Sequence, residues 1–233
     1  MAKSNKEIWE AQYAKGSYIN MYPFGELPSC VFRKYGKHTD KSQLKVLEIG
    51  SGTGNNLWFF AREGFETYGI ETSPTAVSLS RKLLDREGVT AKIIEGSFVD
   101  LSEFKESFFD LVLDRCSLYC VEKSDFYKSL EEVYRVLKQG GNFLSFMYSD
   151  QSECLKYGKK VDVNTYGDFT YGPFKDVGTG HFVNKKELID KIYKGYSIEY
   201  IKRVRYDYLY PKKENEIEVF ITMGMKLGIN TLL

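Results

Sequence analysis

Three glycines at alternate positions, Gly50, Gly52 and Gly54, follow an apolar run over residues 44–49, and a helical pattern begins directly after them. A glycine turn between a buried strand and a helix brings backbone N–H groups and a helix N-terminus against a ligand, so this stretch predicts a nucleotide-type site. Its spacing argues against two common ligands. A dinucleotide fingerprint needs its third glycine at position 55, which is asparagine, and a phosphate-binding P-loop needs a Gly-Lys-Ser/Thr triplet, which is absent.

Two acids stand beside this turn. Glu48 lies two residues before Gly50, and Glu71 ends the next apolar run, 21 positions after Gly50 (71 − 50). The pattern E-x-G-x-G-x-G resembles motif I of the class I S-adenosylmethionine (SAM) methyltransferases. This resemblance implies that the glycine backbone lies beside the methionine end of SAM and that Glu48 reaches its ammonium. A carboxylate at the position of Glu71 is suited to accept hydrogen bonds from both ribose hydroxyls.

Further cofactor contacts are implied by the same resemblance. Gly69-Ile70-Glu71-Thr72-Ser73 resembles motif II, which would place Thr72 beside adenine. After the third strand Ser97 replaces the acid that the family usually has, and Phe98 is expected to pack on the ring. The fourth strand ends at Asp114 and Arg115, which are expected to face the methionine end. The predicted cofactor residues are Tyr13, Glu48, Gly50, Gly52, Gly54, Asn55, Glu71, Thr72, Ser97, Phe98, Asp114 and Arg115.

Methyl transfer is an in-line displacement, which a protein assists by aligning the nucleophile and by taking up its proton. Histidine is the residue type suited to act as a general base for a hydroxyl, so His181, in Gly178-Thr179-Gly180-His181-Phe182, is the candidate. A histidine that only fixes a loop is the alternative. The motif resembles small-molecule methyltransferases, including those acting on sugars of surface polysaccharides. The predicted substrate-binding residues are Tyr22, Tyr119, Tyr148 and His181.

Other acceptors fit the sequence less well. Methyltransferases of base amino groups carry Asn/Asp-Pro-Pro-Tyr where this chain has Asp114-Arg115-Cys116-Ser117. Cys116 lacks the neighbouring proline of cytosine-C5 enzymes, and Glu122 alone does not make the glutamate pair of arginine methyltransferases. A small polar metabolite remains, with a hydroxyl favoured over an amine and a nucleotide sugar or polysaccharide precursor as the best guess.

Two other functions stay open. A metal-assisted O-methyltransferase could hold Mg²⁺ through Asp114 and Asp150, although the Asp-Asn half of that signature is absent, and we expect no metal. A SAM-binding protein without turnover is the second.

Composition limits the partners. The 233 residues carry a net charge of +1, which does not favour nucleic acid or an anionic membrane. Apolar stretches are of strand length, and the first residues lack a signal-peptide core. Four cysteines without a C-x-x-C pair indicate reduced thiols, so we expect a cytoplasmic protein. We expect it to be a monomer or a homodimer.

The elements that would position these residues alternate between strand and helix. Strands are expected over residues 44–49, 65–71, 91–95, 108–114, 142–148, 197–208 and 217–226, and helices over 5–15, 74–87, 124–138 and 185–193. Such alternation predicts an α/β, doubly wound, mostly parallel seven-stranded sheet with ligands at the C-terminal strand ends. The resemblance adds that the last strand runs antiparallel, as in the Rossmann-like methyltransferase fold.

We expect a single domain over residues 1–233, divided into four parts. Residues 1–43 would form an N-terminal helical lid, in which Trp9, Tyr13 and Tyr22 close over the cofactor or, alternatively, pack on the sheet edge. The SAM-binding half and a substrate-side insertion after strand five would follow, and the last helix and strands complete the chain. Their bounds are 44–148, 149–183 and 184–233.

Overall fold

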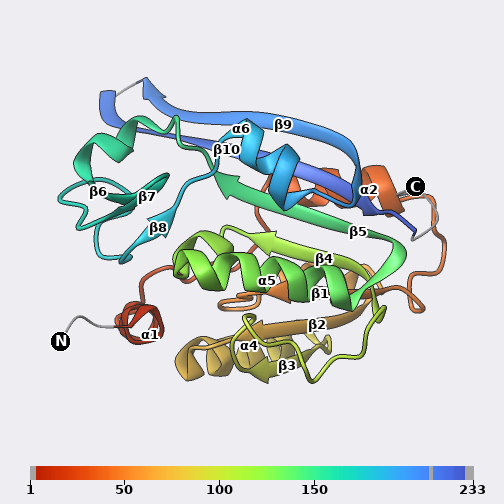
Figure 1. Ribbon diagram of the computed structural model, residues 1–233. Helices are drawn as coiled ribbons and strands as arrows, with labels where there is room; N and C mark the ends of the chain where they lie inside the picture. The colour runs from red at the N-terminus through yellow and green to blue at the C-terminus, as the bar shows by residue number, and fades with distance from the viewer. Residues whose placement is uncertain (1–3, 210–211, 229–233) are drawn as a thin grey trace.

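The computed structural model describes residues 4–209 and 212–228, and its centre is a seven-stranded sheet of order β3-β2-β1-β4-β5-β10-β9 (Figure 1). Neighbouring pairs from β3 to β5 are parallel, whereas β10 runs antiparallel to both β5 and β9. The predicted doubly wound sheet with an antiparallel last strand is therefore confirmed. Its strands are β1 (Lys45–Ile49), β2 (Glu66–Glu71), β3 (Lys92–Glu95), β4 (Phe109–Arg115), β5 (Leu137–Tyr148), β9 (Tyr196–Leu209) and β10 (Lys212–Lys226).

Helices cover both faces of this sheet. The helices are α1 (Asn5–Ala14), α2 (Glu26–Tyr35), α3 (Asn55–Arg62), α4 (Pro74–Glu87), α5 (Lys123–Val136) and α6 (Lys185–Glu187), which continues as a π-helical turn over Leu188–Ile192. Buried side chains of α2, α3 and α4 pack on one face, and those of α5 and the π-helical turn pack on the other. None of the helices within residues 4–209 and 212–228 has both the length and the apolar character needed to cross a membrane.

Local sequence accounts for several boundaries. The Ser73 hydroxyl accepts the N–H of Ala76 at 3.0 Å, and Gly88, at φ 66°, ends α4, so this helix has its predicted bounds. The end of α5 differs from the prediction. β5 begins at Leu137, where we expected the helix to continue, because Leu137 pairs with Phe109 of β4 and the following glycines lie inside a bulged strand.

The segment after β5 folds over the C-terminal ends of the parallel strands. It contains a short 3-10 helix (Glu153–Tyr157) and a three-stranded sheet (Figure 1), whose strands are β6 (Lys159–Asp162), β7 (Thr165–Gly167) and β8 (Gly180–His181). Its own aromatic core includes Phe169, Phe174 and Phe182. This small sheet and α1 lie at the edge where β4 and β5 end (Figure 1).

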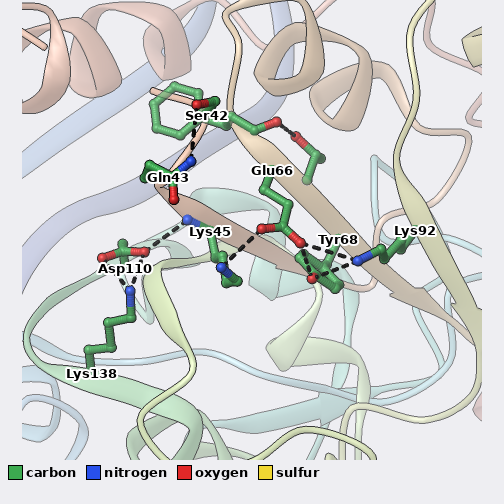
Figure 2. A network of polar contacts seen from close by, with 10 residues as sticks. Ser42, Gln43, Lys45, Glu66, Tyr68, Lys92, Asp110 and Lys138 are labelled. Carbon is green, nitrogen blue, oxygen red and sulfur yellow. Dashed lines mark hydrogen bonds and ion pairs between the residues drawn. The ribbon is translucent and has the colours of Figure 1, made fainter. Parts of the chain in front are cut away.

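A polar network joins the parallel strands at the opposite edge of the sheet, where these strands begin (Figure 2). Glu66 accepts contacts from Lys45 at 3.0 Å and Lys92 at 3.2 Å, and the Tyr68 hydroxyl also donates to it. Asp110 accepts the backbone N–H of Lys45 and the Lys138 ammonium, each at 2.8 Å. These contacts tie β1, β2, β3, β4 and β5 together away from the ligand edge.

Candidate cofactor and acceptor site

A cavity of about 540 Å³ lies at the C-terminal ends of β1, β2, β4 and β5. It extends from the tips of β2 and β3, through the glycine turn, to the ends of β4 and β5, with α1 over it. Most of the predicted cofactor residues meet there. Those that line the cavity are Tyr13, Glu48, Gly50, Gly52, Asn55, Glu71, Thr72, Ser97, Phe98 and Arg115.

The glycine turn needs glycine for two physical reasons. All three glycines have positive φ, at 63°, 52° and 82° for Gly50, Gly52 and Gly54. A Cβ on Gly50 would also lie 2.4 Å from the Ser117 hydroxyl oxygen, and one on Gly54 would lie 2.0 Å from that of Ser80. Gly54 does not line the cavity. Its predicted cofactor contact is therefore replaced by close packing of the turn against α4.

Glu71 links the tip of β2 to the glycine turn. Its two carboxylate oxygens accept the backbone N–H groups of Gly52 and Ser73, each at 2.9 Å. Burial raises the pKa of this carboxyl, although the same hydrogen bonds oppose the rise. The carboxylate is thus held rigidly at the cavity wall, where its remaining lone pairs are available to ribose hydroxyls.

Glu48 presents an unsatisfied oxygen. The side-chain amide of Asn56 donates to Oε1 at 2.6 Å, but buried Oε2 has no hydrogen-bond partner among the described residues. Burial raises the pKa of this carboxyl to about 8, which favours its protonated form at neutral pH unless a cation binds beside it. A cation bound beside it would satisfy Oε2 and favour the ionised form, which suits the ammonium of SAM.

Asp114 occupies a different place from the one predicted. Its side chain is fully buried, and Oδ1 accepts the N–H groups of Ser117 at 2.8 Å and Leu118 at 3.0 Å. The residue does not line the cavity. Asp114 is therefore a turn-stabilising residue, which holds the loop after β4 and with it the left-handed backbone of Cys116, at φ 54°.

The N-terminal helix lies against the cavity. Trp9 and Tyr13 line it. Glu10 of α1 accepts the Ser73 hydroxyl at 2.5 Å and the N–H of Thr75 at 3.2 Å, at the start of α4. On its other side α1 reaches the insertion, because the Gln12 side-chain amide donates to the carbonyl of Asp176 at 2.9 Å. The helix thus connects the cofactor half to the insertion.

Tyr22 does not join Trp9 and Tyr13. Its side chain is 75% exposed, stands edge-on to the Trp58 ring and is not part of the cavity wall. Only its backbone carbonyl is used, as acceptor of the Asn55 side-chain amide at 2.9 Å. The predicted substrate contact by the Tyr22 side chain is wrong for this structure, since the loop directs the ring outward.

His181 is also outside the cavity. The side chain is 1% exposed, Nδ1 lies 3.1 Å from the Thr165 hydroxyl and Nε2 lies 2.8 Å from Glu187. Although burial of Glu187 opposes it, hydrogen bonds from His181 and Tyr127 hold the pKa of that carboxyl at about 2. The predicted general base is therefore a core residue, because strand pairing of β8 with β7 places its ring within the insertion, against Phe126.

Asp114 and Asp150, the two carboxylates of the metal-assisted alternative, do not line the cavity. Asp150 is beyond the cavity wall, and its carboxylate accepts the Gln151 amide at 3.0 Å, while Asp114 holds the turn described above. Across the described part of the chain, no three His, Cys, Asp or Glu side chains are grouped so as to hold a metal ion.

Beyond β4 the cavity has an aromatic end. Tyr119 and Tyr148 line it, as the sequence predicted, with ring centroids 4.8 Å apart. Phe24, Cys116 and Asn56 also line it but were not predicted. Asn56 closely follows the glycine turn in the sequence, so its place at the site could have been predicted. Phe24 reaches the cavity from a loop that is distant in the sequence.

Sequence comparison identifies a methyltransferase domain over residues 47–145. A protein of Geobacillus sp. (strain WCH70) named as a methyltransferase is 26% identical over 133 residues, which cover 56% of this chain and 53% of that protein. The uncharacterized methyltransferase YbaJ of Bacillus subtilis (strain 168) is 31% identical over 102 residues, which cover 44% and 39%. The chain thus spans about half or less of these relatives.

Structural comparison agrees with the fold. The 1,6-didemethyltoxoflavin-N1-methyltransferase of Burkholderia thailandensis, solved with S-adenosylhomocysteine, matches with a TM-score of 0.69 and 15% identity, covering 96% of this chain and 87% of that one. The domain match, this fold and the cavity with its Glu48 and Glu71 carboxyls together identify SAM as the cofactor. Residues 47–145 thus form a methyltransferase domain, and the chain has the Rossmann-like methyltransferase fold.

Proposed function

We propose that the protein transfers a methyl group from SAM to a hydroxyl of a small polar molecule. The observation that carries this proposal is the convergence of Glu48 and Glu71, from adjacent strands, on one cavity. In the proposed arrangement Thr72, Ser97 and Phe98 surround adenine, Glu71 holds the ribose and Glu48 holds the ammonium.

SAM supplies the activated methyl group, and the chain supplies positioning. In this proposal helix α1, whose Trp9 and Tyr13 line the cavity, would shield the bound cofactor from water, and the methyl group would face the acceptor at the end of β4. With His181 outside the wall, Glu122 and Asp125 are the lining acids left to take the proton of a hydroxyl.

The aromatic end supports a small acceptor. Tyr119, Tyr148 and Trp9 offer ring faces and hydroxyl groups to a compact polar molecule, and among such molecules a nucleotide sugar or polysaccharide precursor is our first candidate. A nitrogen acceptor is the second candidate, because the neighbour solved with S-adenosylhomocysteine is named as an N1-methyltransferase of a small molecule.

Glu71→Ala tests the cofactor assignment. Since hydrogen bonds to a charged group are worth about 1.5–3 kcal/mol, we expect SAM affinity to fall by that amount in calorimetry. Exposed Glu87→Ala is the matched control and should bind SAM as the wild type does. Unchanged SAM affinity in Glu71→Ala would refute the ribose assignment.

Turnover is tested separately with methyl-labelled SAM and pools of nucleotide sugars and of small amines. Label in a product supports the enzyme, and the labelled pool identifies the acceptor atom. If SAM binds but no pool is labelled, the non-catalytic SAM-binding alternative replaces the proposed transfer.

A further inference from the structure

Arg115, which the sequence led us to expect at the methionine end of the cofactor, is a cation in the cavity wall. It is the last residue of β4, and its guanidinium carbon lies 3.6 Å from the centroid of the Phe24 ring and 5.4 Å from that of Phe146. Its Nε atom is buried and has no hydrogen-bond partner among the described residues. Two aromatic rings thus fix the guanidinium in place while leaving donor capacity unused.

Within residues 4–209 and 212–228 Arg115 makes no ion pair, and the side chains that interact with it include the phenol of Tyr148 and the thiol of Cys116. Arg115 favours ionisation of Glu48 and Asp114, against the burial that raises the pKa of both, but neither carboxyl forms an ion pair with it. An unpaired charge removed from water is costly, which favours an anionic ligand here.

Arg115 lies between Glu48 and the aromatic end of the cavity. Its contacts Phe146 and Tyr148 belong to β5, on the side of β4 away from β1 and β2, where Glu48 and Glu71 lie. Its third contact, Phe24, comes from the N-terminal loop. The guanidinium thus stands where the two ends of the cavity meet, close enough to Glu48 to favour its ionisation and in contact with the aromatic residues of β5.

We propose that the methyl acceptor carries an oxyanion, a carboxylate or a phosphate, which Arg115 binds at the aromatic end of the cavity. This inference rests on the proposed methyl transfer and narrows its substrate class. A planar guanidinium donates two parallel hydrogen bonds to either group. Tyr119 and Tyr148 would contact the adjoining apolar part of the acceptor.

The test uses the purified protein loaded with S-adenosylhomocysteine and titrated in a calorimeter with benzoate, phenyl phosphate and neutral benzamide. We expect at least one anion to bind about 10-fold or more tightly than benzamide, because a charge-assisted bidentate contact is lost with the amide. Arg115→Met should abolish this preference and Arg115→Lys should retain part of it. Arg81→Met, at an exposed arginine of α4, is the control that should behave as the wild type.

Cofactor binding in the same variants distinguishes the other outcomes. Arg115→Met should bind S-adenosylhomocysteine and 5′-methylthioadenosine as the wild type does. A selective loss of S-adenosylhomocysteine affinity would assign Arg115 to the carboxylate of the cofactor and overturn the inference. Equal binding of benzoate, phenyl phosphate and benzamide, no binding of either anion, or an anion preference that survives Arg115→Met would also overturn it. Failure of wild-type protein to bind S-adenosylhomocysteine would instead remove the proposed function.

Discussion

At the scale of single residues, burial decides what each acid of the site can do. Glu48 and Glu71 are both buried, but Glu71 accepts two backbone N–H groups, whereas Glu48 accepts one amide and retains an orphaned oxygen. Hydrogen bonds to the charged form favour ionisation and burial opposes it. The Glu71 carboxylate is therefore fixed in place to accept further hydrogen bonds. The Glu48 carboxyl would ionise when a cation binds beside it.

Ionisation of Glu48 has a measurable consequence. Burial raises its pKa to about 8, so we expect SAM binding at pH 7 to release protons as the ammonium favours the carboxylate. Calorimetry in buffers of different ionisation enthalpy measures this release, and Glu48→Gln should reduce it. If the wild type releases no protons, or if Glu48→Gln releases as many as the wild type, Glu48 does not bind the ammonium of SAM.

At the scale of elements, α1 is held to the cavity by polar contacts from its first residue and from its middle. Asn5 donates to the carbonyl of Cys120, and Glu10 accepts from Ser73 and Thr75 at the N-terminus of α4. No residue of α1 is fully buried, so these few contacts and the Trp9 and Tyr13 rings decide whether it stays in place. That it acts as a lid over SAM stays a prediction.

Glu10→Ala removes one of these attachments. We expect faster amide hydrogen exchange over residues 5–14 and weaker SAM binding, by about 3- to 10-fold, because charged hydrogen bonds at a helix start are lost. In the wild type SAM should slow exchange in the same segment. Lys15→Ala, exposed just beyond α1, is the control. If SAM does not change the exchange rate of this segment, α1 does not act as a lid and only packs against the domain.

At the scale of the whole molecule, the two edges of the sheet respond oppositely to pH. At the ligand edge the pKa of Glu48 is raised above its ordinary value, so the empty protein loses stability as pH rises from about 4.5 to 8. At the opposite edge hydrogen bonds from Tyr68 and Lys45 hold the pKa of Glu66 at about 2. Its contribution to stability is present above about 4.5 and is lost as pH falls toward 2.

Glu66→Gln checks the second edge (Figure 2). Urea unfolding should show a loss of about 0.5–1 kcal/mol at pH 7, the scale of a half-exposed ion-pair network. The difference from wild type should shrink at pH 3, where the wild-type carboxylate is also losing its advantage. SAM affinity should not change, since this edge is remote from the cavity. A deficit that is equal at both pH values would contradict the ionic origin of this contribution.

The sequence by itself determined the elements whose signals are local. The glycine turn between β1 and α3, the Ser73 cap and Gly88 stop of α4, and the alternation of strands and helices all depend on neighbouring residues. The position of Glu71 followed from the same information, because the carboxyl ends of parallel strands meet at one edge. These features were sufficient to predict the fold and SAM.

Only the tertiary structure decided which way the remaining side chains face. The His181 ring lies outside the site because it is hydrogen-bonded to Thr165 and Glu187. The Asp114 carboxylate lies outside it because it accepts two N–H groups of its own turn. Arg115 acquired its place from Phe24, which lies 91 positions earlier (115 − 24). Such contacts depend on how distant segments pack, and a single sequence does not encode them as a local pattern, so the acceptor end of the cavity could be read only from the folded chain.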